Sequence, residues 1–358
     1  MDFALDGTQE QVRELADDVL RRSVDHGRTD GGRDAVVWKA LADADLLSLA
    51  VPEQQGGSGL GVVETAVVLG EIGRRTADVP ALSTLAFGVL PVARFGTAAQ
   101  QDEVLRGVES GRVLTGALNE PADPLPARPR LTARRDESEL VLSGRKTAVQ
   151  HADAAERMLV SCTVDGEGTG IALVDPTSSG VTLHRTPSST GSPEHTAVFD
   201  DVRISADDLL GGRCGPDVLE GAHEFAMVGI CSLARGSLAG ALELTSEHVR
   251  TRTQFGRPLA AFQAVAGQVA DVYIASRTLD LATWAACWGL TSGNAPEDCR
   301  TAAAWLTTAA PPALHTCHHL HGGVGLDVTC PLHRHTALVK DLTRLLGGAE
   351  ASHDRIAS

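Results

Sequence analysis

Residues 250–263 of the chain read RTRTQFGRPLAAFQ. Two arginines stand on either side of a threonine, and Gln254, Phe255, Gly256 and Pro258 follow as turn residues before a helical pattern resumes. An arginine such as Arg252, fixed beside a turn, can hold an anion through the fork of its guanidinium group. On its own, an arginine-rich helix end is more often a solvated surface, so the rest of the chain decides between these interpretations.

The composition limits the kind of protein and its partners. The 358 residues fit two or three sub-domains, and the formal charge of −15, with no basic block, argues against a nucleic-acid partner. Asp2 follows Met1 directly, without the pattern of a secretory signal, and no uncharged apolar run reaches the length of a membrane span. The seven cysteines include no CxxC pair, which is typical of reduced core cysteines in a cytosolic protein. We therefore expect a cytoplasmic protein that binds neither nucleic acid nor membrane.

The hydrophobic pattern divides the chain into three parts. Residues 1–112 show helical periodicity, and residues 113–212 consist of short β-branched segments separated by Gly, Pro, Ser and Asp. Residues 213–358 return to long helices, whose many small residues favour close packing against another helix or subunit. The order of helical domain, β domain and helical domain indicates an α+β multidomain protein, because a regular helix–strand alternation would instead indicate an α/β fold.

Three local patterns add detail. Thr8, with Gln11 three residues later, resembles a capping box at the start of the first helix. Ser143 and Gly144 form a candidate hairpin corner in the β domain. The Gly-rich loop VPEQQGGSGLG at 51–61 has neither the GxGxxG spacing nor a following Lys-Ser/Thr pair, so it supports neither a Rossmann site nor a P-loop.

Six segments, in this order along essentially the whole chain, resemble the signatures of the acyl-CoA dehydrogenase family. The most specific is the R-x-x-FG-x-x-x-x-x-FQ pattern that contains the opening stretch. The segments are VPEQQGGSGLG at 51–61, ALNEP at 117–121, LSGRKTAVQHADAAERMLV at 142–160, FDDVRISADDLLGG at 199–212, RTQFGRPLAAFQAVAGQVADV at 252–272 and LHGGVG at 320–325.

The resemblance implies a helical N-terminal domain, a middle β-barrel or sandwich, and a C-terminal four-helix bundle. It also implies FAD, shared across a subunit interface, with the ADP half held by the neighbouring subunit's R-x-x-FG turn and GG-x-G loop. The guanidinium of Arg252 suits a diphosphate, and glycines let backbone N–H groups approach phosphate closely. The residues that the resemblance assigns to FAD are Arg252, Gln254, Phe255, Phe262, Gln263, His319, Gly322 and Gly323.

A histidine-rich segment precedes the GG-x-G loop and raises the alternative of a metal site. His318 and His321 are three residues apart, a spacing that can place two ligands on one helix face. No carboxylate stands nearby, however, and the segment runs directly into the glycine turn. We expect no metal here, and we expect His319 to be either a neighbour of FAD or a packed histidine.

The chain departs from the family where the catalytic base is expected. Counting from Asp341, which resembles the family's R-D pair, places Ala349 at the position of the glutamate base, with Glu350 one residue later. Some members place the base on the long helix before R-x-x-FG, and that position is Ala226 here. Glu224 is two helical steps away and should point elsewhere. Glu350 is therefore a weak candidate for the base, and Asp341 is more consistent with a structural role.

The residues expected beside the flavin ring also differ from the family pattern. NEP is followed by ADPLPARPR in place of the family's Gly-Ser-Asp, and Ala148 and Gln150 replace an aromatic residue and a threonine. The residues lent to a neighbour are thus retained, whereas those serving the chain's own flavin are lost. The resemblance is then to heteromeric actinobacterial members that act on steroid side chains and have fewer flavins than subunits.

The first hypothesis is therefore a non-catalytic subunit that completes the FAD site of a second acyl-CoA dehydrogenase subunit. The acyl-CoA would bind through that partner, and an electron-transfer flavoprotein would be the electron acceptor. The alternatives are a homomeric dehydrogenase with a relocated base, Glu350 first, a flavin-dependent oxygenase of the same fold, and a flavin-free binding protein.

Overall fold

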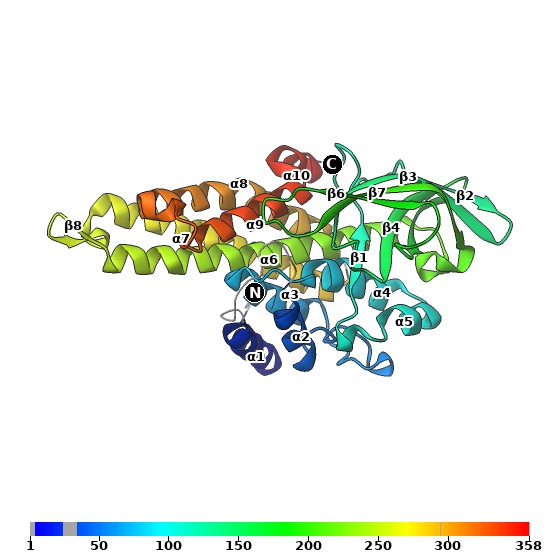
Figure 1. Cartoon of the computed structure of the whole chain (residues 1–358), viewed down its shortest axis with the longest axis horizontal. Coiled ribbons are helices and arrows are strands. Elements are labelled where there is room, and N and C mark those ends of the chain that lie inside the picture. Colours follow the sequence, from blue (N-terminus) through cyan, green and yellow to red (C-terminus); the bar gives the residue numbers. More distant parts are fainter. Residues whose placement is uncertain (1–3, 24–33, 294, 358) are drawn as a thin grey trace.

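The computed structural model describes residues 4–23, 34–293 and 295–357. Figure 1 shows a helical layer formed by the N-terminal part, a curled β-sheet at one end of the molecule, and long C-terminal helices that run past both. The α+β multidomain fold expected from the sequence is confirmed, with a single curled sheet as its middle part.

The N-terminal helices form the first layer. Their first helix begins after Asp6, whose side chain accepts the N–H of Gln9 while the side chain of Gln9 accepts the N–H of Asp6. This reciprocal pair is the capping box, and the prediction that assigned it to Thr8 and Gln11 is wrong by two residues. The helices are α1 (Gly7–Ser23), α2 (Ala35–Asp43), α3 (Val62–Arg75), a π-helical segment (Leu82–Val89) that continues into α4 (Leu90–Phe95), and α5 (Ala98–Leu105).

The middle part is one seven-stranded sheet. Its strand order is β1-β4-β2-β3-β7-β6, and β5 pairs with β4. The strands are β1 (Leu114–Ala117), β2 (Thr132–Asp136), β3 (Glu139–Gln150), β4 (Arg157–Val164), β5 (Gly168–Val174), β6 (Val181–Thr186) and β7 (Glu194–Ser205).

The predicted hairpin corner at Ser143 and Gly144 is wrong, because both residues lie inside the continuous strand β3. β3 pairs with β7 along its whole length, and the register shifts between Leu142 and Gly144. Gly144 has φ +146°, so a β-bulge rather than a turn explains the glycine.

A buried ion pair holds the centre of this sheet. Nζ of Lys146, whose side chain is fully buried, lies 2.8 Å from Oε1 of Glu120 and 2.8 Å from Oγ of Ser161. Glu120 also accepts the backbone N–H groups of Arg130 and Leu131. The glutamate of NEP and the lysine of GRK therefore hold the β domain together.

The C-terminal helices pack closely on the N-terminal layer. Glycines line the crossing of α3 and α6: a β-carbon on Gly236 would overlap the carbonyl oxygen of Gly70, and one on Gly73 would overlap that of Leu233. The close packing expected from the small residues is thus confirmed. The helices are α6 (Pro216–Thr251), α7 (Gln263–Thr291), α8 (Pro296–His321), α9 (Leu332–Leu345) and α10 (Gly348–Ala357).

Helix α6 is the one described helix that is long and apolar enough to cross a membrane, by length and composition alone. However, 78% of its most apolar window is buried inside the molecule. Burial of this kind is typical of the central helix of a folded domain, and α6 contacts α3, α7, α8 and α9.

Candidate functional site

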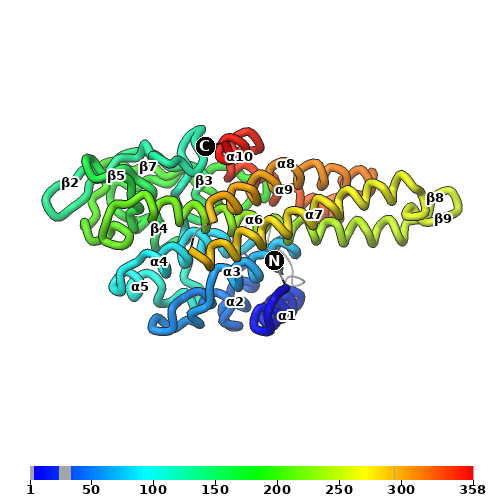
Figure 2. Tube along the Cα trace, turned by 180° about the vertical axis from the view of Figure 1, so that it is seen from behind, coloured from blue at the N-terminus to red at the C-terminus, as the bar shows by residue number. Residues whose placement is uncertain are grey.

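The R-x-x-FG turn is a hairpin at the free end of a helical arm. α6 ends at Thr251, and strands β8 (Thr253–Gln254) and β9 (Arg257–Pro258) pair before α7 begins. Phe255 and Gly256 form the tip, with φ +53° and +76°, as a two-residue hairpin turn requires. Figures 1 and 2 both show this hairpin projecting beyond the rest of the molecule on the ends of α6 and α7.

The side chains expected to hold FAD are presented to solvent on this arm. Arg252, Gln254 and Gln263 are exposed, and Phe255 is 91% exposed. The Phe255 ring meets Phe262 edge-on at 6.2 Å, and the guanidinium of Arg257 lies 4.1 Å above Phe262. These contacts form an aromatic platform beside Arg252.

The guanidinium of Arg252 remains available for an anion. Within the described part of the chain no carboxylate forms a salt bridge with it, whereas its neighbour Arg250 pairs with Glu247 at 2.7 Å. The backbone N–H of Arg252 is used to cap α6, because it donates to the carbonyl of His248 at 2.9 Å. Arg252 therefore has a fixed backbone and an unneutralised head group.

The GG-x-G loop begins where α8 ends. Gly322 caps α8 with φ +59° and its N–H donates to the carbonyls of His318 and His319. A β-carbon on Gly322 or Gly323 would meet no atom within 4 Å, so internal packing does not explain Gly323. An open glycine pair is suited to close approach by a ligand. His319 is exposed on the last turn of α8.

A pair of stacked histidines joins the turn to the loop. The rings of His248, on the last turns of α6, and His321, at the end of α8, are parallel within 18° with centroids 4.4 Å apart. The structure therefore brings Arg252 and the Gly322–Gly323 loop onto neighbouring helix ends. Sequence reasoning missed the role of His248, because contact between two distant helices leaves no local pattern.

The remaining histidines have separate partners. Nε2 of His318 lies 2.7 Å from Oγ1 of Thr336, and Nδ1 of His321 lies 2.9 Å from the carbonyl oxygen of Cys317. His315 and His319 are exposed. Among the described residues, no group of three or more His, Cys, Asp or Glu side chains is arranged to hold a metal ion.

Ala148, one of the two residues expected beside the chain's own flavin ring, faces a closed space. Asn119, Ala148 and Leu345 line a space of about 10 Å³, which is the size of one water molecule at most. Leu125, from the segment after NEP, is buried in it with φ +49°. The side-chain amide of Asn119 accepts the N–H of Leu125 at 3.0 Å and donates to the carbonyl of Leu345 at 2.9 Å.

Gln150 does not share this space with Ala148. It lines a separate cavity of about 300 Å³ between the end of α3, the loop at 188–192 and α9. Ala148 has φ +55°, and the β3–β7 register shifts between Lys146 and Val149, so the two residues face different cavities. The structure thus separates two side chains that the sequence placed beside one ring.

The carboxylates considered as bases lie in different surroundings. Glu350 is exposed on the first turn of α10, and Ala226 is fully buried. Asp341 accepts the N–H groups of Ser189 and Thr190, each at 2.9 Å, which agrees with the structural role expected for it. None of the residues lining the closed space beside Ala148 is acidic, whereas Asp78 and Asp341 line the cavity that contains Gln150.

Glu224 has the most perturbed environment of these carboxylates. It lines a third cavity, of about 460 Å³, between the first half of α6, α10 and the loop at 122–127. Burial raises the pKa of its carboxyl, and Glu220 raises it further against the opposing effect of Arg300. His223 lines the same cavity, and burial lowers its pKa to about 3.

Comparison with known proteins agrees with the order of these elements. Models of the N-terminal and C-terminal domains of acyl-CoA dehydrogenases match residues 6–112 and 215–358. The acyl-CoA dehydrogenase FadE28 of Mycobacterium tuberculosis is 42% identical over 349 residues, which cover 97% of this chain and 96% of FadE28.

Two solved structures match nearly the whole chain. A variant of the Tcur3481–Tcur3483 steroid ACAD has a TM-score of 0.90 and 32% identity, over 98% of this chain and 96% of the matched chain. The ChsE4–ChsE5 complex of Mycobacterium tuberculosis has a TM-score of 0.91 and 30% identity, over 100% and 98%. Fold, motif order and these similarities together establish that the chain belongs to the acyl-CoA dehydrogenase family.

Proposed function

We propose that this chain is the non-catalytic subunit of a heteromeric acyl-CoA dehydrogenase. It lends Arg252, the aromatic platform and the Gly322–Gly323 loop to the FAD of a catalytic partner, and it holds no flavin ring of its own. The observation that carries the proposal is the contrast between an open, cationic arm and the closed space beside Ala148, which Leu125 helps to line.

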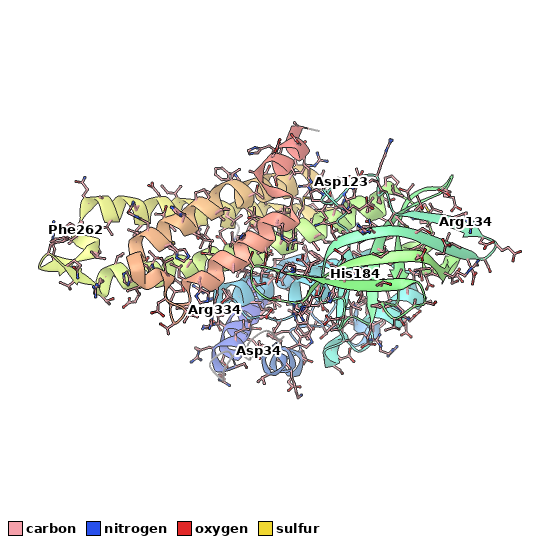
Figure 3. The ribbon with its side chains drawn as sticks, turned by 45° about the horizontal axis from the view of Figure 1, so that its top comes forward. Asp34, Asp123, Arg134, His184, Phe262 and Arg334 are labelled. Carbon is pink, nitrogen blue, oxygen red and sulfur yellow. The ribbon has the colours of Figure 1, made fainter. Side chains whose placement is uncertain are left out.

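The positions of the arm and of the space beside Ala148 support the sharing of FAD between subunits. Figure 3 shows Phe262 at the tip of the arm and Arg134 at the opposite end of the molecule, on the β domain. Ala148 lines the same small space as Ile230 of α6, whereas Arg252 follows the end of that helix, about 30 Å further along at 1.5 Å per residue. Residues this far apart on one chain would serve two different FAD sites when subunits associate.

The residues of the arm have separate roles toward FAD. The guanidinium of Arg252 can donate two parallel hydrogen bonds to the diphosphate, and the open glycines expose backbone N–H groups beside it. Gln254, Phe255, Phe262, Gln263 and His319 supply amide, apolar and ring contacts around these groups. FAD bound in this way would accept the β-hydride of an acyl-CoA thioester whose α-proton is removed by a base of the partner.

The relatives support a particular partner and substrate class. One matched structure is a steroid ACAD that pairs two proteins, and another is a complex of two proteins. We therefore propose a second acyl-CoA dehydrogenase subunit as partner, an acyl-CoA of the steroid side-chain type as substrate, and an electron-transfer flavoprotein as acceptor. The proposed location is the cytoplasm, and the proposed domain boundaries are 1–112, 113–212 and 213–358.

A homomeric dehydrogenase with its own base is the alternative, and Glu224 is the observation that favours it. A carboxyl with a raised pKa in a ligand-sized cavity is a typical general base. Glu350, the first candidate from the sequence, is exposed and lies outside this cavity. If the isolated chain turns over acyl-CoA, Glu224→Gln and Glu350→Gln will identify which carboxylate acts.

Arg252→Ala tests the proposal most simply. The chain is co-expressed with its partner, and the flavin bound by the purified complex is measured from its absorbance. We expect Arg252→Ala to lower the affinity for FAD at least about tenfold, since a charge-assisted hydrogen bond contributes about 1.5–3 kcal/mol. Arg250→Ala is the matched control, because Arg250 is two residues away and pairs with Glu247. Equal flavin content in both variants would refute the proposal.

A further inference from the structure

Two histidines connect the parts of the proposed FAD-binding arm. His248 and His321 come from different helices, and their stacked rings are the aromatic contact between the end of α6 and the end of α8. Arg252 follows His248 by one helical turn, and Gly322 follows His321 directly. Each histidine thus stands immediately before one of the two elements that would surround the diphosphate.

His321 is held in a fixed orientation. Its side chain is buried, and Nδ1 lies 2.9 Å from the carbonyl oxygen of Cys317, so Nδ1 carries the proton and donates it. Gly325 packs against the same residue: a β-carbon at position 325 would lie 2.8 Å from the β-carbon of His321. The GG-x-G loop therefore rests directly on His321.

His248 is tied to Arg252 through the backbone. The carbonyl of His248 accepts the N–H of Arg252, which is the last hydrogen bond of α6. A change in the position of His248 therefore changes the direction in which Arg252 leaves the helix. The ring of His248 is half-buried, and among the described residues its closest aromatic neighbour is the ring of His321, so the stack fixes its position.

The surroundings of His248 favour its neutral form. Burial lowers the pKa of His248, and the neighbouring His321 and Arg252 lower it further. On α8, burial also lowers the pKa of His318, with His321, His315 and His333 adding to the effect against a backbone hydrogen bond to Gly325 that raises it. Every charged neighbour named here is basic, so a proton on His248 is disfavoured near neutral pH.

We infer that His248 and His321 form a positioning clasp that holds Arg252 beside the Gly322–Gly323 loop, so that both can contact the FAD diphosphate. This inference rests on the proposed function, since it concerns the same arm. Neither histidine needs to touch FAD. The clasp acts by preorganisation, because a guanidinium already aimed at its ligand loses less freedom on binding.

The test is a double-mutant cycle on FAD affinity. The chain is co-expressed with its partner, the complex is stripped of flavin, and the Kd for FAD is measured by the quenching of flavin fluorescence. We expect His248→Ala to raise the Kd roughly tenfold, in line with the loss of one aromatic pair. His248→Phe keeps a stacking ring without a titrating group, and we expect it to stay within about twofold of the native Kd.

The cycle separates the clasp from the proposed function. If His248 acts through Arg252, His248→Ala will add almost nothing in an Arg252→Ala background. His315→Ala, on the exposed face of α8, is the control and should leave the Kd unchanged. Thermal unfolding of each complex shows whether a variant is folded.

Three results would overturn the clasp. If the Kd of the double variant is raised by the product of the two single effects, His248 and Arg252 act independently. If His248→Phe raises the Kd as much as His248→Ala does, stacking is excluded. A normal Kd for His248→Ala beside a raised Kd for Arg252→Ala would remove the clasp and leave the proposed function intact. A normal Kd for Arg252→Ala would instead remove the proposed function itself.

Discussion

The carboxylate of Glu120 has two basic partners, the buried Lys146 and the exposed Arg130. Lys146 is fully buried, whereas the side chain of Arg130 is 62% exposed. Burial opposes ionisation of Glu120, but Lys146 and the N–H groups of Leu131 and Arg130 outweigh it and hold the pKa below its usual value. Burial lowers the pKa of Lys146 as well, but the hydrogen bond and the charge of Glu120 oppose that effect.

Removing the two partners of Glu120 should have unequal effects. Lys146→Met leaves a buried carboxylate without its cation, and we expect the free energy of unfolding to fall by about 3–5 kcal/mol. Arg130→Met removes an exposed partner and should cost less than about 1 kcal/mol. Urea unfolding of both variants measures the difference, and equal effects would contradict the structural role of Lys146.

His335 provides a test of stability against pH. Its ring is buried, Nδ1 lies 3.1 Å from Oγ of Ser237, and burial lowers its pKa to about 4. The unfolded chain binds this proton at its ordinary pKa, so the contribution of His335 is complete above about pH 6.5 and is lost as the pH falls toward 4. We expect native stability to fall by about 1.4 kcal/mol per pH unit from this group, and His335→Gln to reduce that slope. An unchanged slope between pH 7 and 5 would contradict the burial of a neutral His335.

For individual residues, the sequence predicted which ones form the turns of the arm, but not which side chains surround them. Arg252, Phe255 and Gly322 belong to motifs with local turn chemistry, so their positions follow from the pattern. Leu125 and His248 could not be predicted, because their roles come from contacts with segments far along the chain. The raised pKa of Glu224 arises in the same way, from burial that only the fold creates.

Among the elements, α3 and α6 cross with backbone nearly touching backbone. Alanine at Gly73 or Gly236 would place a β-carbon against a carbonyl oxygen of the other helix. We expect each substitution to lower the free energy of unfolding by more than about 2 kcal/mol, since the helices must separate. A β-carbon added to Gly267, on α7, would meet no atom within 4 Å, so Gly267→Ala should stabilise the isolated chain by about 0.5–1 kcal/mol. Denaturation of the three variants tests this order.

The elements also explain why two local predictions failed. A serine and a glycine inside a strand-like segment indicate either a turn or a bulge, and the pairing of β3 with β7 selects the bulge. Several polar residues near the N-terminus can cap a helix, and Asp6 with Gln9 does so here. By contrast, the long helices and the change from helical to strand periodicity were predicted correctly, because each extends over many residues.

For the whole molecule, the C-terminal helices and the hairpin carry apolar side chains that no described segment covers. Ile274 on α7 and Trp305 on α8 are exposed, and Phe255 extends beyond them. Under the proposed function these residues lie in contacts between subunits. We expect Ile274→Asp to prevent assembly with the partner, as measured by native mass spectrometry of the co-expressed proteins. Val36→Asp, an equally exposed apolar position on α2, should leave the complex intact, and an intact complex with both variants would argue against this interface.

The most direct measurement of the central claim is the number of FAD molecules per subunit. The chain is purified alone and together with its partner, and flavin absorbance is compared with protein concentration. The account predicts almost no flavin and no dehydrogenase activity in the chain alone, and one FAD for each pair of unlike subunits in the complex. A lone chain that binds one FAD per subunit and oxidises acyl-CoA would contradict it.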